Sequence, residues 1–339
     1  MKKFYYVALL ALFVSCKSMP TKQVEAEQNE KKIVSYDAEL SGFQYPYPTS
    51  TFSFESQFQK MQMTYMDVKP AGKSVKTVVL FHGKNFSGYY FEPIIKQLVG
   101  RGMRVIVPDQ IGFGKSTKPN SYQYSFHVLA QNTKKLLESI GVENFTLVGH
   151  SMGGMVATRF ALMYPESVQK LILVNAIGLE DYKVLTPFKG FDELYSGELE
   201  NNEDKIRNYQ IQFYYDGKWK EEYEPMIQPS IGWTNGPDKA LVAKNAAMTS
   251  ELIYTQPVVY EFKQLKMPTT IINGLRDKTA PGKAWAPKEN QALMGDYPRL
   301  SRKVTRMIPN GKLVALDGLG HMPFVEDFER FMKVFVPEL

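Results

Sequence analysis

The amino-acid sequence predicts an α/β fold, a mostly parallel sheet of about eight strands flanked by helices, with a helical cap inserted late in the chain. Short, nearly continuous apolar runs recur along the chain, as in parallel strands that are buried on both faces of a sheet. Stretches with helical periodicity separate several of these runs. One interval is far longer than an ordinary connection and contains no convincing strand, which indicates the inserted cap.

Six apolar runs are assigned to the parallel part of the sheet. They read VKTVVLF (75–81), RVIVPD (104–109), FTLVGH (145–150), KLILVN (170–175), TTIING (269–274) and KLVALD (312–317). Before them, TFSFESQ (51–57) and KMQMTYMDV (60–68) alternate apolar and polar residues, which is typical of a half-exposed hairpin. We expect this hairpin to open the sheet.

Three stretches between the apolar runs have helical patterns. They read FEPIIKQLVGRG (91–102), FHVLAQNTKKLLESIG (126–141) and MVATRFALMYP (155–165). The last ends at a proline, which stops a helix. The interval from Asn175 to Thr269 is rich in aromatic residues, which favours a small core of its own with some rings lining a pocket. We therefore expect a main domain of residues 41–178 and 263–339 and a helical cap of residues 179–262.

Composition excludes several classes of protein. The chain has 339 residues, 44% of them hydrophobic and 22% charged, which is close to the globular average and argues against wholesale disorder or a multi-spanning membrane protein. The formal net charge is +6, but no run of Lys or Arg is long enough to form a nucleic-acid-binding patch. We therefore expect one main core and no nucleic-acid partner.

The first residues have the pattern of a secretory signal. Two lysines precede an apolar run that is too short to span a bilayer, which is typical of a signal peptide, here residues 1–15. Cys16 is the only cysteine, so no internal disulfide can form, and FVSC resembles a bacterial lipobox in which this cysteine is lipidated. This interpretation predicts an exported, membrane-anchored lipoprotein of a bacterial cell envelope, facing the periplasm or the exterior, with residues 16–40 as a flexible tether. The alternative is a chance cysteine in a hydrophobic leader.

The sequence GHSMG (149–153) lies between a strand pattern and a helix pattern. A serine between two glycines in that context is typical of a nucleophile elbow, Gly-x-Ser-x-Gly. The turn brings neighbouring backbones together, so Gly149 and Gly153 must lack side chains that would clash. It also holds Ser151 in a strained conformation and exposes its hydroxyl at the carboxyl edge of the sheet, where α/β folds bind ligands.

A serine hydroxyl needs a base, and the chain has four histidines. His150 adjoins the nucleophile on a strand and should point away from the oxygen of Ser151. His82 precedes a glycine at a strand end and is expected to order that loop, and His127 begins a helix as a surface or packing residue. His321 lies in the glycine-containing loop LDGLGHMPF after the last strand, at the same sheet edge, and is the candidate base.

The base needs an acid that fixes its tautomer and stabilises its charged form. Asp277 follows a predicted strand in INGLRDKTAP and lies between Ser151 and His321 in the sequence. The order serine, acid, histidine is the one found in α/β-hydrolases. Asp181 is the alternative acid, and Asp317 lies too near His321 along the chain to be attractive.

Two N–H donors are needed for the oxyanion that develops during acyl transfer. The backbone N–H of Met152 is one by position. The second is expected from FHGKNFSG, where the backbone N–H of Lys84 is favoured and that of Asn85 is the alternative. The sequence PDQIGFGKS (108–116) lacks the Lys-Thr of a phosphate loop and is assigned to the rim of the site.

Taken in order, FHG, PDQIGFGKS, GHSMGG, GLRDKTAP and DGLGHMPFVEDFERF resemble the α/β-hydrolase superfamily over about residues 43–339. The similarity is greatest to the cap-bearing serine hydrolase branch, which includes esterases, carbon–carbon bond hydrolases, haloperoxidase-like enzymes and relatives of prolyl aminopeptidase. The resemblance implies an α/β-hydrolase fold, a small-molecule substrate and no metal or organic cofactor.

Together these features predict a serine hydrolase that cleaves an ester or related acyl bond through an acyl-enzyme. The aromatic cap favours a small to medium apolar substrate. Carbon–carbon bond hydrolysis and aminopeptidase-like amide hydrolysis need the same Ser-His-Asp triad, so the triad leaves these alternatives open. A non-enzymatic binding protein that has kept the fold is the remaining alternative.

Overall fold

The computed structural model describes residues 1–3 and 33–339, and its strands form one sheet in the order β1-β2-β4-β3-β5-β6-β7-β8. The strands are β1 (Thr49–Ser56), β2 (Gln59–Val68), β3 (Lys76–Phe81), β4 (Met103–Pro108), β5 (Phe145–His150), β6 (Val168–Val174), β7 (Thr269–Gly274) and β8 (Gly311–Leu316). The β1-β2 hairpin is antiparallel, β2 pairs antiparallel with β4, and all later neighbours are parallel. The predicted hairpin and the six predicted parallel strands are confirmed.

Alternate residues of each buried strand point to opposite faces of the sheet, and each face has its own hydrophobic core. In β3, Val79 and Phe81 belong to one core, whereas Val78 and Leu80 belong to the other. The first core includes residues of α2 (Phe126–Ser139), α3 (Met152–Met163) and α9 (Tyr297–Met307). The second includes residues of α1 (Glu92–Val99) and α11 (Phe328–Phe335). This arrangement leaves the carboxyl edge of the sheet free for the loops that follow the strands.

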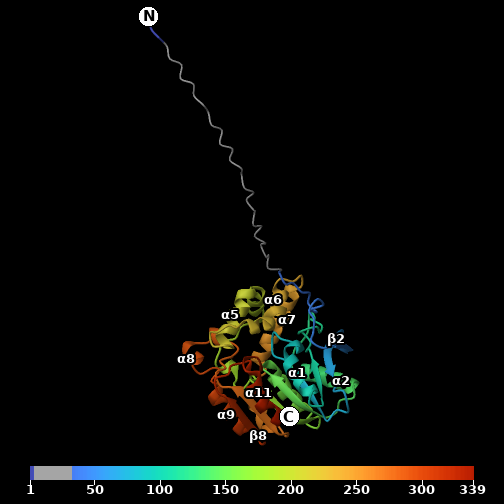
Figure 1. Ribbon diagram of the computed structural model, residues 1–339. Helices are drawn as coiled ribbons and strands as arrows, with labels where there is room; N and C mark the ends of the chain where they lie inside the picture. The colour runs from blue at the N-terminus through green and yellow to red at the C-terminus, as the bar shows by residue number, and fades with distance from the viewer. Residues whose placement is uncertain (4–32) are drawn as a thin grey trace. The chain divides into compact units, whose positions relative to one another are not determined.

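The interval between β6 and β7 is helical in the structure. It contains η2 (Tyr182–Val184), α4 (Phe191–Leu199), α5 (Glu203–Phe213), η3 (Glu221–Tyr223), α6 (Glu224–Thr234), α7 (Lys239–Thr255) and η4 (Val259–Gln264). Figure 1 shows α5, α6 and α7 gathered at one end of the molecule, away from α9 and β8. The sequence was therefore right that this long interval contains helices in place of a strand.

The remaining elements are short and surround the sheet. They are η1 (Gly88–Phe91), η5 (Lys283–Trp285), α8 (Lys288–Gln291), α10 (Pro323–Glu326) and η6 (Val336–Glu338). Helix boundaries follow local signals in the sequence. The Ser125 side chain accepts a hydrogen bond from the Val128 N–H at the start of α2, and α3 ends just before Pro165.

The predicted tether is wrong at its C-terminal end. The Tyr36 N–H donates to the Gly232 carbonyl at 3.0 Å, and Trp233 Nε1 donates to the Ala38 carbonyl at 3.2 Å. Ala38 and Leu40 are buried. These residues are therefore bound to α6 of the cap. The polar composition of this segment did not predict its docking on the cap. Many of the contacts are made by backbone groups, which are the same in every sequence.

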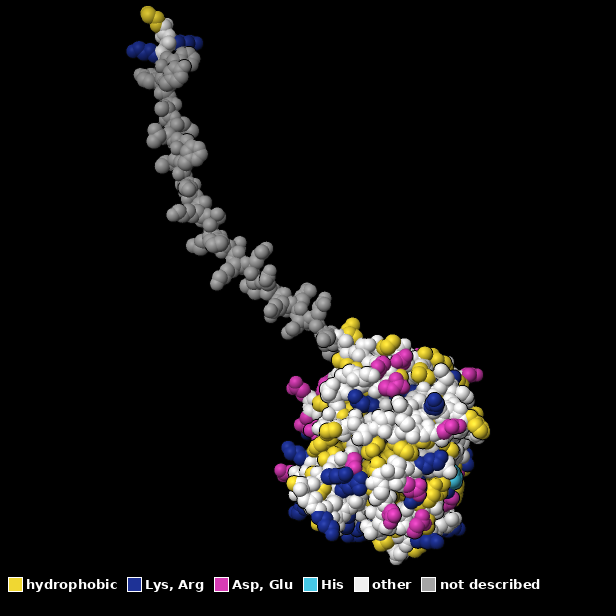
Figure 2. Space-filling view, turned by 90° about the vertical axis from the view of Figure 1, so that its right-hand side faces the viewer, with side chains coloured by type: hydrophobic (Ala, Val, Ile, Leu, Met, Phe, Trp, Pro, Cys, Tyr) yellow, Lys and Arg dark blue, Asp and Glu magenta, His cyan; other side chains and the backbone are white. Residues whose placement is uncertain are grey.

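The predicted signal peptide, except its first three residues, and Cys16 lie outside the residues that the structure describes. Within residues 1–3 and 33–339, no helix is both long and apolar enough to cross a bilayer. On the face shown in Figure 2, basic and acidic side chains are interspersed over the surface. That face therefore presents no broad field of a single charge sign.

Candidate active site

The turn from β5 into α3 holds Ser151 at φ 55° and ψ −124°, a conformation that is strained for any residue with a side chain. Its glycines are required by close backbone approaches. A Cβ on Gly149 would lie 2.4 Å from the carbonyl oxygen of Gly153, and a Cβ on Gly153 would lie 2.2 Å from that of Phe81. Both distances are far below van der Waals contact, so the turn tolerates only glycine at these positions.

Ser151, His321 and Asp277 meet in one chain of hydrogen bonds. Ser151 Oγ lies 3.0 Å from His321 Nε2, and His321 Nδ1 lies 2.7 Å from Asp277 Oδ2. His321 and Asp277 are buried, and Ser151 is 6% exposed. The structure thus brings together three residues that the sequence separates by more than forty positions at each step.

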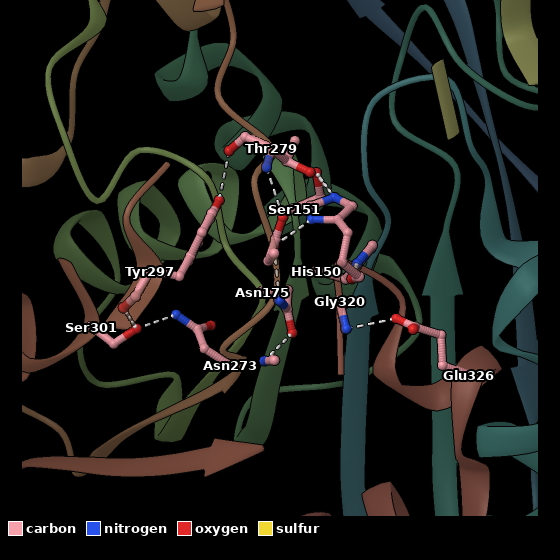
Figure 3. A network of polar contacts seen from close by, with 12 residues as sticks. His150, Ser151, Asn175, Asn273, Thr279, Tyr297, Ser301, Gly320 and Glu326 are labelled. Atoms are coloured by element: carbon pink, nitrogen blue, oxygen red, sulfur yellow. Dashed lines mark hydrogen bonds and ion pairs between the residues drawn. The ribbon is translucent and has the colours of Figure 1, made fainter. Parts of the chain in front are cut away.

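Asp277 is held by further donors on both of its oxygens. Oδ1 accepts the Thr279 N–H at 2.8 Å, and Oδ2 accepts Asn175 Nδ2 at 2.8 Å. Asn175 follows β6 and also accepts the Gly274 N–H at 3.0 Å through Oδ1 (Figure 3). Sequence analysis treated Asn175 only as a strand end. A polar residue at the carboxyl end of a buried parallel strand was the signal that could have identified it.

The loop that carries His321 is fixed from several sides. The Gly320 N–H donates to Glu326 Oε1 at 2.7 Å, an interaction drawn in Figure 3. Burial raises the pKa of Glu326, although Arg276 pairs with it and opposes this shift. From the cap, the Tyr214 ring lies 4.5 Å from the His321 ring, centroid to centroid. Core and cap therefore both determine where the imidazole lies.

The other histidines do not contact Ser151 Oγ. Buried His82 accepts the Gln110 N–H at Nε2 and lies 2.9 Å from the Gly83 carbonyl at Nδ1, so it orders two loops as expected. His127 is exposed on α2. The two ring nitrogens of His150 bond to Tyr90 and to the His321 carbonyl and not to Ser151 Oγ.

The two alternative acids lie apart from the His321 ring. Asp181 bonds to the Lys183 N–H and to the hydroxyl of Tyr260, at the start of η2. Asp317 is exposed after β8. Of the three candidate acids, Asp277 alone bonds to His321 Nδ1.

The segment after β3 passes directly beside the serine. A Cβ on Gly83 would lie 2.9 Å from Ser151 Cβ and 3.4 Å from its Oγ, which places Gly83, the residue before Lys84, beside the serine. Met152 begins α3 immediately after Ser151. The Lys84 side chain has a second role, because Nζ lies 3.0 Å from Glu198 Oε1 of α4 and so joins this loop to the cap.

Comparison with known proteins places this geometry in a family. The family model described as alpha/beta hydrolase fold matches residues 76–216. The crystal structure of a probable hydrolytic enzyme from Pseudomonas aeruginosa superposes with a TM-score of 0.89 and is 44% identical, covering 91% of this chain and 99% of that one. The chain belongs to the α/β-hydrolase superfamily.

More distant curated relatives are also hydrolases. Lipase 1 of Psychrobacter immobilis is 24% identical over 331 residues, which is 96% of this chain and 93% of that protein. RutD of Serratia proteamaculans, whose name gives carbamate hydrolysis as a provisional activity, is 26% identical over 77% of this chain and 89% of its own. This α/β-hydrolase is therefore an enzyme of the hydrolase class.

A cavity of about 550 Å³ lies between the core and the cap of this α/β-hydrolase. Lys84 and Phe86 line it from the core, and Tyr214 and Phe213 line it from the cap. Its wall is mostly apolar and aromatic and also includes several lysines. Ser151 does not itself line the cavity, but Lys84 and Tyr214, which flank the serine and the histidine, both do. The cavity is therefore lined by neighbours of Ser151 and His321.

Within residues 1–3 and 33–339, no group of three His, Cys, Asp or Glu side chains has the proximity needed to hold a metal ion. The polar groups of the α/β-hydrolase site instead bond to one another.

Proposed function

We propose that this α/β-hydrolase is a serine hydrolase that cleaves an ester or related acyl bond of a small to medium apolar substrate through an acyl-enzyme. The observation that carries the proposal is the chain of hydrogen bonds from Ser151 Oγ through His321 to Asp277, with contacts of 3.0 and 2.7 Å. A cavity of about 550 Å³ is lined by Tyr214, the neighbour of the His321 ring. A hydroxyl within hydrogen-bond reach of a base that a third group orients is the arrangement of an activated nucleophile.

The proposed steps follow from this geometry. His321 Nε2 takes the proton of Ser151 as its oxygen attacks the acyl carbon, and then gives it to the leaving group. Asp277 accepts the Nδ1 hydrogen, which keeps Nε2 unprotonated in the resting state and stabilises the imidazolium that forms. The backbone N–H groups of Met152 and Lys84 hold the oxyanion. A water molecule activated by the same histidine then releases the acid.

The cavity wall supports an apolar acyl or alcohol group in the substrate. Aromatic and aliphatic side chains from core and cap line most of the space, which favours burial of apolar substrate surface. One relative is named as a lipase, which supports an ester substrate. A panel of p-nitrophenyl esters of increasing chain length, with matched aryl amides, tests the preference for esters and distinguishes it from amide hydrolysis.

Covalent labelling tests the reaction itself. A fluorophosphonate probe is expected to label the wild-type protein and the control variant Ser121→Ala, in which an exposed serine is replaced, but not Ser151→Ala. Hydrolysis of p-nitrophenyl butyrate should be lost in parallel. Folded wild-type protein that neither reacts with the probe nor hydrolyses any ester of the panel would refute the proposal.

We also propose, from the sequence of the first sixteen residues, that the chain is exported and lipidated at Cys16. Several acyl chains on that residue would anchor the enzyme stably, since one chain gives only marginal membrane binding. Labelled palmitate fed to producing bacteria should appear on the wild-type protein and not on Cys16→Ala. Labelling that persists in the variant would exclude this site.

A further inference from the structure

His150, the residue before the nucleophile, is a buried titratable group that the proposed mechanism does not use. It is fully buried and lies among three rings, those of Tyr90, His321 and Phe324, with centroid distances of 5.6, 5.0 and 5.1 Å. Both of its ring nitrogens have partners. A buried imidazole in the middle of an active site therefore needs a role of its own.

The partners determine the tautomer of His150. Nε2 lies 3.0 Å from the backbone carbonyl oxygen of His321, which can only accept, so Nε2 carries a hydrogen. Burial and the neighbouring His321 lower the pKa of His150 well below its usual value, so the ring is neutral and Nδ1 has a free lone pair. Nδ1 must then accept the hydrogen of the Tyr90 hydroxyl, 2.9 Å away.

The hydroxyl of Tyr90 continues the chain to the other side of the site. Its oxygen accepts the Gly83 N–H at 2.9 Å. Burial raises the pKa of Tyr90 well above its usual value, so the hydroxyl keeps the proton that it donates to His150. The bonds thus run in one direction only, from Gly83 to Tyr90 to His150, while His150 donates to His321. No member can reverse its bond without leaving another unpaired.

This chain of hydrogen bonds connects the segment that carries a proposed oxyanion donor with the residue that carries the proposed base. Gly83 immediately precedes Lys84, whose N–H is a proposed oxyanion donor, and the His321 carbonyl belongs to the residue that carries the proposed base. Tyr90 is fixed in turn by stacking on Phe86 and Phe91, with centroids 4.9 and 4.3 Å away. Through Tyr90 and His150, the Gly83 loop is therefore connected to the His321 loop, which lies far from it in the sequence.

We propose that His150 and Tyr90 are positioning residues that hold the His321 main chain and the Gly83–Lys84 peptide in register around Ser151. The inference rests on the proposed function, because it assigns these two residues to the same acyl transfer. Their loss moves the base and an oxyanion donor by fractions of an ångström, which lowers the rate of the chemical step more than substrate binding.

Three variants each remove defined hydrogen bonds from this network. Tyr90→Phe removes the hydroxyl and leaves the ring packing. His150→Gln places an amide nitrogen near the position of Nε2 and keeps the donor to His321, but loses the acceptor for Tyr90. His150→Asn keeps an acceptor near the position of Nδ1 and loses the donor to His321. Tyr89→Phe is the matched control, since the Tyr89 hydroxyl is also bonded, to the Met226 carbonyl at 2.6 Å, but lies outside this chain.

Steady-state hydrolysis of p-nitrophenyl butyrate gives the test. Tyr90→Phe and both His150 variants are expected to lower kcat about 10- to 100-fold with KM changed less than about threefold, and Tyr89→Phe to change neither. Tyr90→Phe combined with His150→Gln should lower kcat no further than Tyr90→Phe alone, because the hydrogen bond that His150→Gln breaks is already lost in Tyr90→Phe. Tyr90→Phe combined with His150→Asn should be worse than either.

Thermal denaturation of each variant separates positioning from folding. A lowered Tm with unchanged kcat at a temperature where the variant is folded would overturn the inference, as would kcat effects that multiply in the Tyr90→Phe/His150→Gln pair. If a His150 variant does not fold, Tyr90→Phe, which keeps the aromatic packing, decides the question alone. Wild-type protein that fails to react with a fluorophosphonate would refute the proposed function instead, so the two failures are distinguishable.

Discussion

At the scale of single residues, the acid of the site is selected by its surroundings. Asp277 is buried and accepts hydrogen bonds from Asn175, Thr279 and His321, whereas Asp181 bonds to groups at the start of η2. A carboxylate that accepts several hydrogen bonds is held in one orientation. Asp277 and Asp181 carry the same carboxylate, so only their surroundings in the fold distinguish them.

This difference predicts the effect of removing each charge. Asp277→Asn is expected to lower kcat by about 10⁴-fold, because an amide at this position favours the wrong tautomer of His321. Asp181→Asn should leave kcat within about threefold of wild type. The measurement is ester hydrolysis by both variants after their folding has been checked by circular dichroism. Full activity in Asp277→Asn would assign the acid elsewhere.

Two buried histidines make stability depend on pH. Burial lowers the pKa of His82 and His150 below the usual value of 6.5. Below pH 6.5 the unfolded chain therefore binds more protons than the native protein, so the free energy of unfolding falls as the pH falls. The expected slope is at most about 1.4 kcal/mol per pH unit for each histidine.

Urea denaturation at pH 6.5 and at pH 5.5 measures this dependence. Wild type should lose stability between the two values, and His150→Asn should lose about half as much, because His82 still contributes. Equal losses in both proteins would mean that His150 is not held neutral by the fold.

At the scale of elements, the site depends on how closely β5, α3 and β3 approach one another. The strand-to-helix turn is strained at Ser151, and it persists because β5 and α3 are packed on both sides of the turn. The price of that packing is the loss of any side chain at Gly149 and Gly153. The same approach brings Gly83 beside the serine. Ser151 and the Gly83–Lys84 segment are thus positioned by one contact between elements.

Two glycine variants test this contact. Gly153→Ala is expected to prevent folding or to lower Tm by about 5 °C or more, on the order of 3 kcal/mol or more, because its Cβ meets backbone atoms that cannot move independently. Gly197→Ala, in the middle of α4 with open space at its Cβ, should be neutral or more stable by about 0.5–1 kcal/mol. Differential scanning calorimetry compares them, and similar Tm values would contradict the argument.

At the scale of the whole molecule, residues before the first strand help to hold the cap on the core. The compact unit begins at Ile33. Tyr36 and Ala38 bond to α6, while the hydroxyl of Tyr45 donates to Asp109 Oδ2 in the rim loop at 2.6 Å. Cap and rim are therefore joined by a segment that precedes both in the sequence.

Truncation separates this segment from the residues before it. Removal of residues 1–32 should leave Tm unchanged. Removal of residues 1–44 should lower Tm by roughly 5 °C or more, since it exposes to water the surface against which Ala38 and Leu40 are buried. Hydrolysis of longer-chain esters should fall in the shorter protein, because the cap loses a constraint. Equal Tm values for the two truncations would show that the segment does not stabilise the cap.

The sequence by itself determined the sheet, the elbow and the pairing of Ser151 with His321, and it favoured Asp277 over Asp181 as the third partner. Periodicity and turn residues are local, and the order of elements limits where the carboxyl ends of parallel strands can meet. Only the tertiary structure decided the roles of Asn175, Tyr90 and the docked N-terminal segment. Their hydrogen bonds join residues far apart in sequence through backbone groups and rings, and no local pattern distinguishes a side chain that makes such a bond from one that does not.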